Sequence, residues 1–264
     1  MWKQLPATVS VIGLNVLIFL LAAQILPPEN VLVTTLPLYF PKNDNFGIWQ
    51  FVTHMFMHGS TTHLFMNMFG LFSFGSILER IWGVKRFLIF YFVAGIGAAI
   101  LYTLIHYVEF QSTSSMFERN GIPASTLNQI LQAENPEGVM MQSIPVETIQ
   151  LLKENIAPLR KLYNIFNLRM VGASGAIYGV LTAFGLLFPN AKLSLIFLPV
   201  PIAAKFFIPA LLLLDFFSGI TGFSIFGGGI AHFAHLGGAL IGFLLMVLWR
   251  KDVKPEVQPL LYDL

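Results

Sequence analysis

The chain has 264 residues, of which 56% are hydrophobic and only 11% are charged, against a usual charged share of about 25%. The mean hydropathy is +0.73. So few charges cannot cover the surface of a soluble protein, and the composition argues against a disordered chain, a coiled coil and a nucleic-acid-binding protein. The chain has no cysteine, which excludes a disulfide scaffold, thiol catalysis and thiolate metal sites.

Six apolar segments are long enough to cross a bilayer, which takes about 20 helical residues. They are Thr8–Leu26, Thr61–Leu78, Phe87–Val108, Met170–Phe188, Phe206–Phe226 and Ala231–Trp249. The expected fold is therefore all-α, a polytopic membrane protein with a bundle of six transmembrane helices. A further apolar stretch, Leu193–Ile202, is short and contains two prolines, so we expect a connector there and not a seventh crossing.

The distribution of lysine and arginine predicts the orientation of these helices. Nine of these residues lie on the side that holds both termini, namely Lys3, Arg80, Lys85, Arg86, Lys192, Lys205, Arg250, Lys251 and Lys254. The other side has six, and five of them belong to the long third connection. We therefore expect a multi-pass protein of a bacterial cytoplasmic membrane, with both termini in the cytoplasm.

The third connection, Glu109–Arg169, is the longest polar segment of the chain. Its second half has apolar residues at helical spacing, at Val146, Ile149, Leu152, Ile156, Leu159, Leu162 and Phe166. This pattern predicts an amphipathic helix that lies on the outer membrane surface and is kinked or divided at Pro158. The alternative is a solvated loop with an incidental apolar stripe.

Polar residues occur at one depth in three of the expected spans. The second span carries His63 and Asn67, the fourth carries Ser174, and the sixth carries His232 and His235. At 1.5 Å per residue, all five lie roughly 5 to 10 Å below the outer boundary. Because polar groups in hydrocarbon usually face a bundle interior or a water-filled cavity, we expect one shared site.

Two pairs of glycines predict how the fourth and sixth spans pack. Each pair forms a Gly-x-x-x-Gly step beside a polar residue, and the four residues are Gly175, Gly179, Gly238 and Gly242. Small residues at this spacing let two helix backbones approach closely. If these faces meet, Ser174 and His235 come within hydrogen-bonding distance.

A serine hydroxyl becomes a good nucleophile when a neighbouring base takes its proton, so Ser174 and His235 suggest covalent catalysis. Tyr178 lies one helical turn after Ser174 and could pack against the imidazole and fix its orientation. His63 and Asn67 are four residues apart and share a helix face. With the backbone N–H of Ser174, they could donate hydrogen bonds to the oxyanion of a tetrahedral intermediate.

Three separated motifs resemble the signature blocks of the rhomboid intramembrane serine proteases. They are the block from Gly172 to Gly179 around Ser174, the block Ala-His-Leu-Gly-Gly-x-x-x-Gly that ends at Gly242, and His-x-x-x-x-His-x-x-x-Asn that ends at Asn67. The resemblance extends to Glu79 after the second span. It covers all six spans, which implies a single rhomboid-like membrane domain over residues 1–264 with an extracytoplasmic insertion at about 109–169.

The resemblance implies that Ser174 is the nucleophile, that His235 is the base and that His63 and Asn67 form the oxyanion hole. It also implies that the fifth span and the connection Gly222–Gly229 form a mobile gate for substrate. The expected function is an intramembrane serine endopeptidase that needs no cofactor and no metal. Its partners would be membrane lipid and transmembrane-anchored substrates cut near the outer membrane face, and not nucleic acid.

Two other functions remain open. The chain could be a non-enzymatic, rhomboid-like membrane chaperone or scaffold. It could also be a metalloenzyme that uses His54, His58 and His63 with His232, although the sequence between His54 and His58 lacks the glutamate of a zinc protease motif.

Two positions depart from the family pattern or stay unassigned. Trp49 is followed by Gln50, where many bacterial relatives have an arginine, so any ion pair made by that arginine is absent. Asp215 is a charge inside the fifth span. It is expected to be protonated or to cap polar groups in the outer half of the bundle, and it receives no catalytic role.

Overall fold

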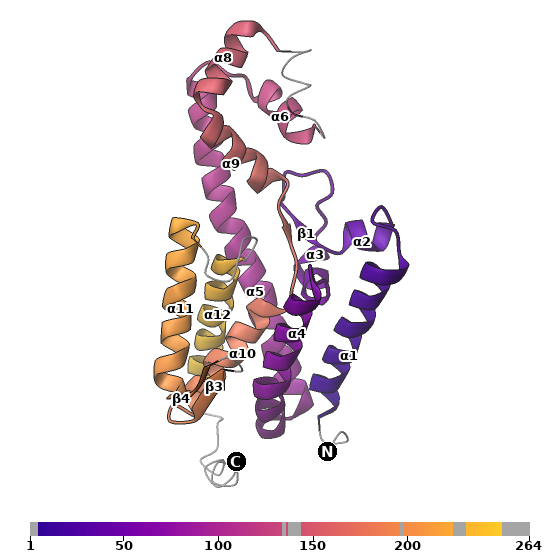
Figure 1. Cartoon of the computed structure of the whole chain (residues 1–264), viewed down its shortest axis with the longest axis vertical. Helices are drawn as coiled ribbons and strands as arrows, with labels where there is room; N and C mark the ends of the chain where they lie inside the picture. Colours follow the sequence, from indigo (N-terminus) through magenta and orange to yellow (C-terminus); the bar gives the residue numbers. More distant parts are fainter. Residues whose placement is uncertain (1–4, 134–135, 137–143, 196–197, 224–230, 250–264) are drawn as a thin grey trace.

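A computed structural model of the chain describes residues 5–133, 136, 144–195, 198–223 and 231–249. The described part is mostly helical, with two short antiparallel strand pairs (Figure 1). Its main helices are α1 (Pro6–Leu20), α4 (Thr61–Gly70), α5 (Ser76–Arg119), α10 (Ser174–Leu187), α11 (Ala204–Thr221) and α12 (His232–Trp249). Shorter helical segments are α2 (Val31–Thr35), α3 (Gln50–Thr53), α6 (Ala124–Gln132), α8 (Val146–Glu154), α9 (Ile156–Phe166) and the turns Leu21–Ile25, His54–Phe56 and Leu71–Gly75.

Four helical segments in the described ranges are long and apolar enough to cross a membrane, namely Pro6–Ala23, Thr61–Arg119, Ala204–Thr221 and His232–Trp249. The second of these contains two of the expected spans, because α4 continues through a π-turn into α5. Gly83 interrupts it with a non-helical φ of 75° and ψ of 166°. The prediction of an all-α polytopic membrane protein is confirmed. The number of six crossings stays a prediction, since α10 has only 14 residues.

Buried contacts bring the start of α1, the start of α5 and the end of α12 to one end of the bundle (Figure 1). The Glu79 carboxylate accepts the backbone N–H groups of Ala7 at 2.9 Å and of Thr8 at 2.8 Å. The rings of Trp82 and Trp249 lie 5.9 Å apart. This arrangement puts both ends of the membrane bundle on one side, and the assignment of that side to the cytoplasm stays a prediction.

Helices α10 and α12 pack with their backbones in contact. A Cβ atom on Gly238 would collide with the backbone carbonyl of Gly175, and one on Gly242 would lie 2.6 Å from Cα of Gly179. On its other side α10 packs against α5, since a Cβ on Gly179 would meet the Ala94 methyl at 2.7 Å. The absence of side chains at these glycines therefore sets the distance between the helices that carry Ser174 and His235.

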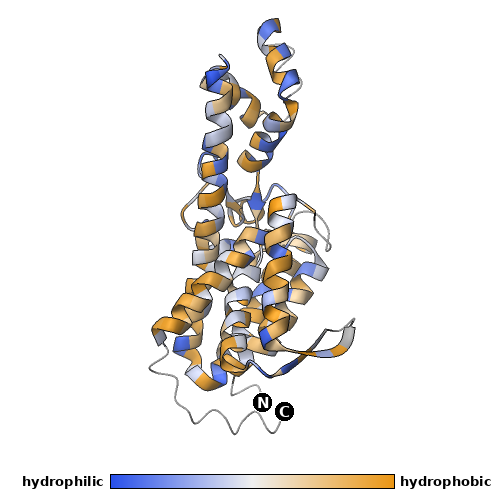
Figure 2. Cartoon of the chain, turned by 90° about the vertical axis from the view of Figure 1, so that its left-hand side faces the viewer, coloured by the Kyte–Doolittle hydropathy of each residue, from blue (hydrophilic) through white to orange (hydrophobic). Residues whose placement is uncertain are grey.

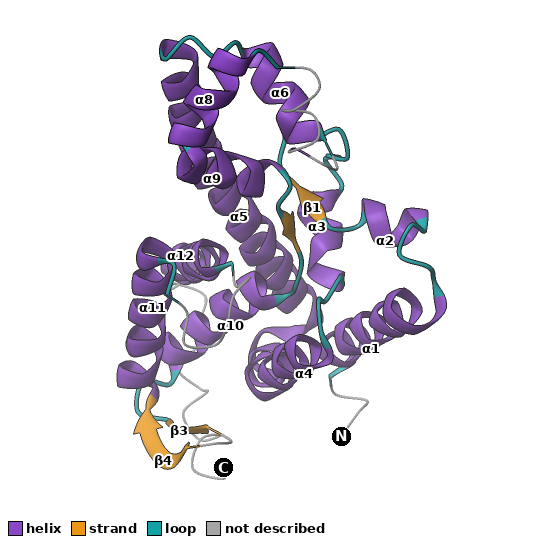
Figure 3. Cartoon of the chain, turned by 45° about the horizontal axis from the view of Figure 1, so that its top comes forward, coloured by secondary structure: helices purple, strands orange, loops and turns teal. Residues whose placement is uncertain are grey.

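The third connection folds into a small helical layer that we call the cap, made of the end of α5 with α6, α8 and α9 (Figures 1 and 3). The cap lies at the end of the molecule away from the start of α1. Its helices mix polar and apolar residues more evenly than the bundle does (Figure 2). The cap has a buried core to which Phe40 of the first connection also contributes. Its other members are Phe110, Phe117, Ile122, Leu127, Ile130, Leu131, Ile144, Leu152, Leu159, Leu162, Ile165 and Phe166.

The amphipathic stripe of the third connection is present, but two details of its prediction are wrong. Five of its seven apolar side chains, Leu159 and Leu162 among them, pack within the cap core instead of facing a membrane surface. The other two, Val146 and Ile156, are exposed. The helix is divided at Asn155, which separates α8 from α9, and not at Pro158. Pro158 is the third residue of α9, where its missing N–H has no partner within the helix to lose.

Two antiparallel strand pairs lie in the connections between the main helices. Strands β3 (Lys192–Leu195) and β4 (Leu198–Ala203) form an antiparallel hairpin where the sequence predicted a connector. Strand β1 (Leu38–Tyr39) pairs with β2 (Arg169–Met170), which precedes α10. The first connection therefore contacts the segment that leads to Ser174.

Gln50 organises the first connection with its side-chain amide. It is fully buried, its Oε1 accepts the Tyr39 N–H at 3.1 Å, and its Nε2 donates to the carbonyls of Thr35 at 3.1 Å and Asn45 at 2.8 Å. A neutral amide side chain therefore satisfies three backbone groups of the loop.

His54 is buried in the same connection, at 1% exposure. Its Nδ1–H donates to the Gln50 carbonyl at 2.8 Å, and its own carbonyl accepts the Gly172 N–H at 2.9 Å. Burial lowers the pKa of His54 from 6.5 to about 4, since the charged form would lose its hydration. His54 is therefore neutral in the folded protein at physiological pH.

The glycine contact predicts a loss of stability in Gly238→Ala. The new methyl group must displace the backbone of α10, and overpacking of this kind costs about 1 to 3 kcal/mol. Thermal unfolding in detergent should show a lower midpoint for this variant. Gly13→Ala on α1 is the matched control, because nothing lies within 4 Å of a Cβ there. Equal midpoints for the two variants would contradict the close packing.

The burial of His54 predicts that the folded state loses stability as the pH falls from 6.5 to 4. In this interval the unfolded chain binds a proton at His54 and the folded chain does not, so acid favours unfolding. His54→Gln, which cannot titrate, should lose less stability over the same interval, by up to about 3 kcal/mol. Denaturant unfolding at several pH values measures the difference, and parallel pH profiles for the two proteins would contradict it.

Candidate active site

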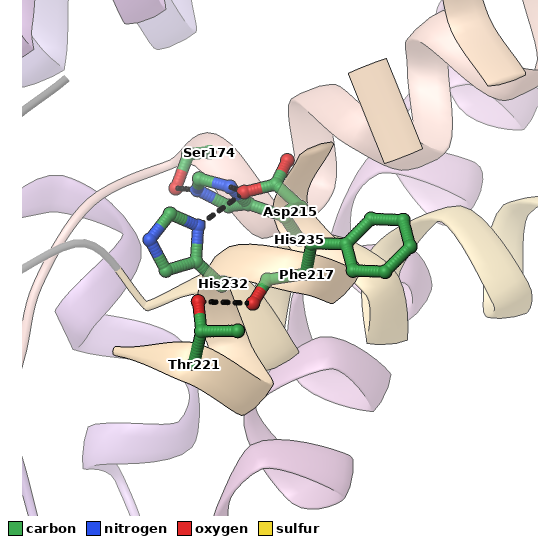
Figure 4. A network of polar contacts seen from close by, with 6 residues as sticks. All are labelled: Ser174, Asp215, Phe217, Thr221, His232 and His235. Atoms are coloured by element: carbon green, nitrogen blue, oxygen red, sulfur yellow. Dashed lines mark hydrogen bonds and ion pairs between the residues drawn. The ribbon is translucent and has the colours of Figure 1, made fainter. Parts of the chain in front are cut away.

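Side chains from three helices form one hydrogen-bonded chain (Figure 4). Ser174, the first residue of α10, has its Oγ 2.9 Å from Nε2 of His235 on α12. The other ring nitrogen of His235, Nδ1, lies 3.1 Å from Oδ1 of Asp215 on α11. The same carboxylate oxygen lies 2.5 Å from Nδ1 of His232.

The donor and acceptor chemistry of these groups determines which ring nitrogen of each histidine carries a hydrogen. An ionised carboxylate only accepts hydrogen bonds, so Nδ1 of both His232 and His235 carries the hydrogen that is donated to Asp215. Nε2 of a neutral His235 is then unprotonated and accepts the hydroxyl hydrogen of Ser174. This arrangement can move a proton from the serine to the imidazole while the imidazole stays in place.

Tyr178 packs on the face of the His235 ring. The two ring centroids are 4.2 Å apart and the planes are inclined by 12°. Tyr178 lies one turn after Ser174 on α10, so the helix that carries the serine also limits the rotation of the histidine. This is the contact that the sequence suggested for Tyr178.

The segment before Ser174 makes a close approach to α4 at Gly172. Its φ is +117°, a conformation that favours glycine. A Cβ at this position would lie 2.7 Å from the imidazole of His63 and 3.5 Å from Nδ2 of Asn67. Gly172 therefore lets the side chains of His63 and Asn67 lie beside the chain that enters α10.

Asn67 is buried at 6% exposure, and its Nδ2 has no hydrogen-bond partner in the structure. A buried donor without an acceptor costs about 1 to 3 kcal/mol. The imidazole of His63 lies on the same face of α4, one turn before Asn67, and its ring centroid is 5.1 Å from that of His58. The site thus contains an amide donor that is free to bind an oxygen atom from outside the chain.

The structure brings together most of the residues that the sequence selected. Ser174, His235 and Tyr178 are in direct contact, and Gly172 brings His63 and Asn67 beside them. The connection Gly222–Gly229 lies outside the described residues from position 224 onward.

Asp215 is the residue of this network to which the sequence analysis gave no role. The expected fifth span ended at Phe226, but α11 ends at Thr221, and Gly222 terminates it in the left-handed conformation with a φ of +72°. Counted from this end, Asp215 lies about 9 Å below the start of the loop, close to the depth of His235. A glycine at this place is a helix stop signal, and it would have indicated the correct depth.

Among the described residues, this network is the only group of side chains with the ligand atoms and spacing to bind a metal ion. The ligand atoms of Asp215, His232 and His235 lie within 4.8 Å of one another. The metal site that the sequence left open, with His54, His58 and His63, does not form such a group in the described part of the chain. The same carboxylate oxygen, Oδ1, accepts hydrogen bonds from Nδ1 of both histidines of the network, and Oδ2 of Asp215 has no hydrogen-bond partner.

Comparison with known sequences identifies related proteins. The sequence model of the Rhomboid domain matches residues 45–112 and 153–252, which is more than half of the chain. The unmatched residues between them are 113–152, and those of them that the structure describes belong to the cap. The chain is 31% identical over 98 residues to Rhomboid-like protease 3 of Toxoplasma gondii, 37% of this chain and 37% of that protein.

Two further relatives are similar over other lengths. RHOMBOID-like protein 6, mitochondrial, of Arabidopsis thaliana is 39% identical over 56 residues, 21% of this chain and 18% of the relative. Rhomboid protease AarA of Providencia stuartii is 28% identical over 145 residues, 50% of this chain and 47% of the relative. Each alignment thus spans less than half of the relative's own length. The domain match over the helices that carry the site establishes that this chain belongs to the rhomboid family.

Proposed function

We propose that the protein is an intramembrane serine endopeptidase in which Ser174 is the nucleophile and His235 the general base. The observation that carries this proposal is the hydrogen bond of 2.9 Å between Ser174 Oγ and His235 Nε2. It joins a hydroxyl to an unprotonated ring nitrogen, which is the pairing that activates a serine. Two of the related proteins are named as rhomboid proteases or rhomboid-like proteases, and they support the same reaction here.

The reaction proceeds in two balanced steps. Ser174 Oγ forms a bond to the carbonyl carbon of the scissile peptide while its proton moves to His235 Nε2, and the C–N bond then breaks as that proton passes to the leaving amine. Water next attacks the acyl-enzyme, giving its proton to His235, and the Ser174 ester bond breaks with the proton returned to the serine. The products are a carboxylic acid and an amine.

The proposed oxyanion hole consists of Asn67, His63 and the backbone N–H of Ser174. The unpartnered Nδ2 of Asn67 supports this role, because the developing negative charge on the carbonyl oxygen supplies the acceptor that the free site lacks. The N–H of Ser174 is at the start of α10, where the first backbone N–H groups of a helix have no partner within it.

The proposed substrates are proteins with a transmembrane anchor, cut near the outer membrane face. The site lies at the ends of α4, α10 and α12 that are away from the start of α1, which we assign to the cytoplasmic side. An intact transmembrane helix hides its carbonyls in hydrogen bonds. Good substrates therefore contain glycine or proline near the outer end of their span, where the helix unwinds most easily.

The whole chain, residues 1–264, then acts as one rhomboid-like membrane domain of the bacterial cytoplasmic membrane, with the cap as an extracytoplasmic insertion. The part of helix α5 that follows Gly83 joins the cap to the bundle. The cap therefore stands above the outer end of the membrane domain, on the side where substrates are expected to be cut.

The proposed mechanism predicts that Ser174→Ala and His235→Ala each abolish cleavage of a transmembrane reporter in proteoliposomes. The double variant should be no worse than either single variant, because residues that act as one unit are not additive. Labelling by a fluorophosphonate should also disappear in Ser174→Ala. Tyr163→Phe in the cap, which removes one hydroxyl contact to Ala133, is the control and should keep its activity. Turnover that persists in Ser174→Ala, or wild-type protein that neither cleaves nor labels, would favour a non-enzymatic scaffold.

The proposed oxyanion hole predicts that Asn67→Ala lowers kcat with little change in KM. A lost oxyanion donor costs up to about 100-fold to 1,000-fold in kcat, because its hydrogen bond strengthens only as charge develops. Steady-state kinetics on the same reporter measures both constants. If KM rises and kcat stays unchanged, Asn67 contributes to binding or packing and not to the transition state.

A further inference from the structure

Helix α11 is attached to the bundle at few points. Only three of its residues are buried, Ala204 and Ile208 near its first turns and Asp215 in its second half. Large side chains in this second half are exposed, including Phe217 at 60% and Ile220 at 62%. The half of α11 that lies nearest to the site is therefore held against α12 mainly around Asp215, with Gly219 packing on the ring of Phe233.

An ionised carboxylate at this depth of a bilayer destabilises the fold unless it is paired with hydrogen-bond donors or a positive charge. Asp215 is 6% exposed, and its Oδ1 accepts hydrogen bonds from His232 and His235 of α12 (Figure 4). These two bonds connect two helices that are otherwise joined by apolar contacts in this region. Moving the second half of α11 away from α12 would break both bonds and leave a charge in hydrocarbon.

We propose that Asp215 is a positioning residue for His235, and that it makes the orientation of the base depend on the closed position of α11. This inference rests on the proposed function, since it needs His235 to act as the base. With α11 closed, Asp215 holds the Nδ1–H of His235, so that Nε2 faces Ser174. With α11 displaced, the imidazole loses this partner and can rotate or take the other tautomer.

The carboxylate also changes the energy of the proton transfer. When Ser174 gives its proton to Nε2, His235 becomes an imidazolium whose Nδ1–H still points at the ionised Asp215, and the negative charge stabilises it. Asp215 itself gains no proton. Because Tyr178 restrains only the face of the ring, the hydrogen bond that His235 Nδ1–H donates to Asp215 supplies the restraint within the ring plane.

The groups around His235 define what else influences its protonation. Asp215 faces it from α11, His232 from α12, Tyr178 from α10 and His63 from α4. Asp215 is the only carboxylate among these groups in the described residues. His232 donates a hydrogen bond to the same oxygen of Asp215. It therefore shares the negative charge that stabilises the His235 imidazolium and cannot take the place of that charge.

Asp215→Asn tests the positioning role. Loss of the charge should lower kcat by about 100-fold to 10,000-fold, as for an aspartate that orients a catalytic histidine, with KM nearly unchanged. The acid limb of the kcat/KM profile against pH should move to lower pH, because imidazolium without its carboxylate loses its proton more readily. Asp215→Glu, which restores the charge, should bring the acid limb back toward that of the wild type.

Thr221→Val is the matched control on the same helix. Its hydroxyl donates to the Phe217 carbonyl of its own helix at 2.7 Å (Figure 4), so its loss should change neither kcat nor the acid limb. Unchanged kcat in Asp215→Asn, or a loss of activity without a shift of the acid limb, would overturn the proposal. Because the wild type must first show cleavage that depends on Ser174, failure of the proposed function would be seen in a separate measurement.

A thiol probe tests the coupling to α11. The chain has no cysteine, so Ser218→Cys places a single thiol on the face of α11 that carries Asp215, three residues further on. In proteoliposomes, Asp215→Asn should raise the rate of alkylation by a water-soluble maleimide several-fold, because the outer half of α11 separates from α12 more often. Equal alkylation rates with and without Asp215 would overturn the coupling.

Discussion

The backbone contact between α10 and α12 is the constraint on which the geometry of the site depends. Without hydrophobic driving force between helices in lipid, close packing supplies the attraction, and glycine permits it. Gly175 and Gly238 meet at the level just below Ser174 and His235, so the two reactive side chains start from backbones in contact. A serine and a histidine are short side chains, and only such a separation leaves their atoms 2.9 Å apart.

Burial in an apolar bundle then determines how the polar groups are paired. Each polar group within the bundle either finds a partner or lowers the stability of the fold. The carboxylate of Glu79 meets this requirement by accepting the first N–H groups of α1. Oδ1 of Asp215 meets it by accepting two imidazole N–H groups, while Oδ2 of Asp215 has no partner. Asn67 Nδ2 is left without a partner, and such an exception at a site is consistent with a group that the substrate completes.

The sequence predicted the bundle and much of the site because both depend on local signals. Apolar length gave the membrane-spanning segments, and glycine spacing predicted which faces of α10 and α12 meet. The role of Asp215 could not be predicted because it depends on where α11 ends, and a span boundary drawn from hydropathy alone was placed five residues too far, at Phe226. The cap was predicted as a surface helix because helical periodicity shows that a face is apolar but does not show what covers it.

The cap and the site are linked through the chain itself. Helix α9 ends at Phe166, whose carbonyl accepts a hydrogen bond from Asn43 at 3.0 Å, and β2 begins three residues later and pairs with β1. Two residues later the Gly172 N–H donates to the His54 carbonyl, and Ser174 begins α10. The segment that presents the nucleophile is thus fixed to the first connection at three successive points. Helix α5 continues from the cap and packs against α10 at Ala94, so the cap is linked to the helix of Ser174 on this side as well, whereas α11 contacts His235 directly through Asp215.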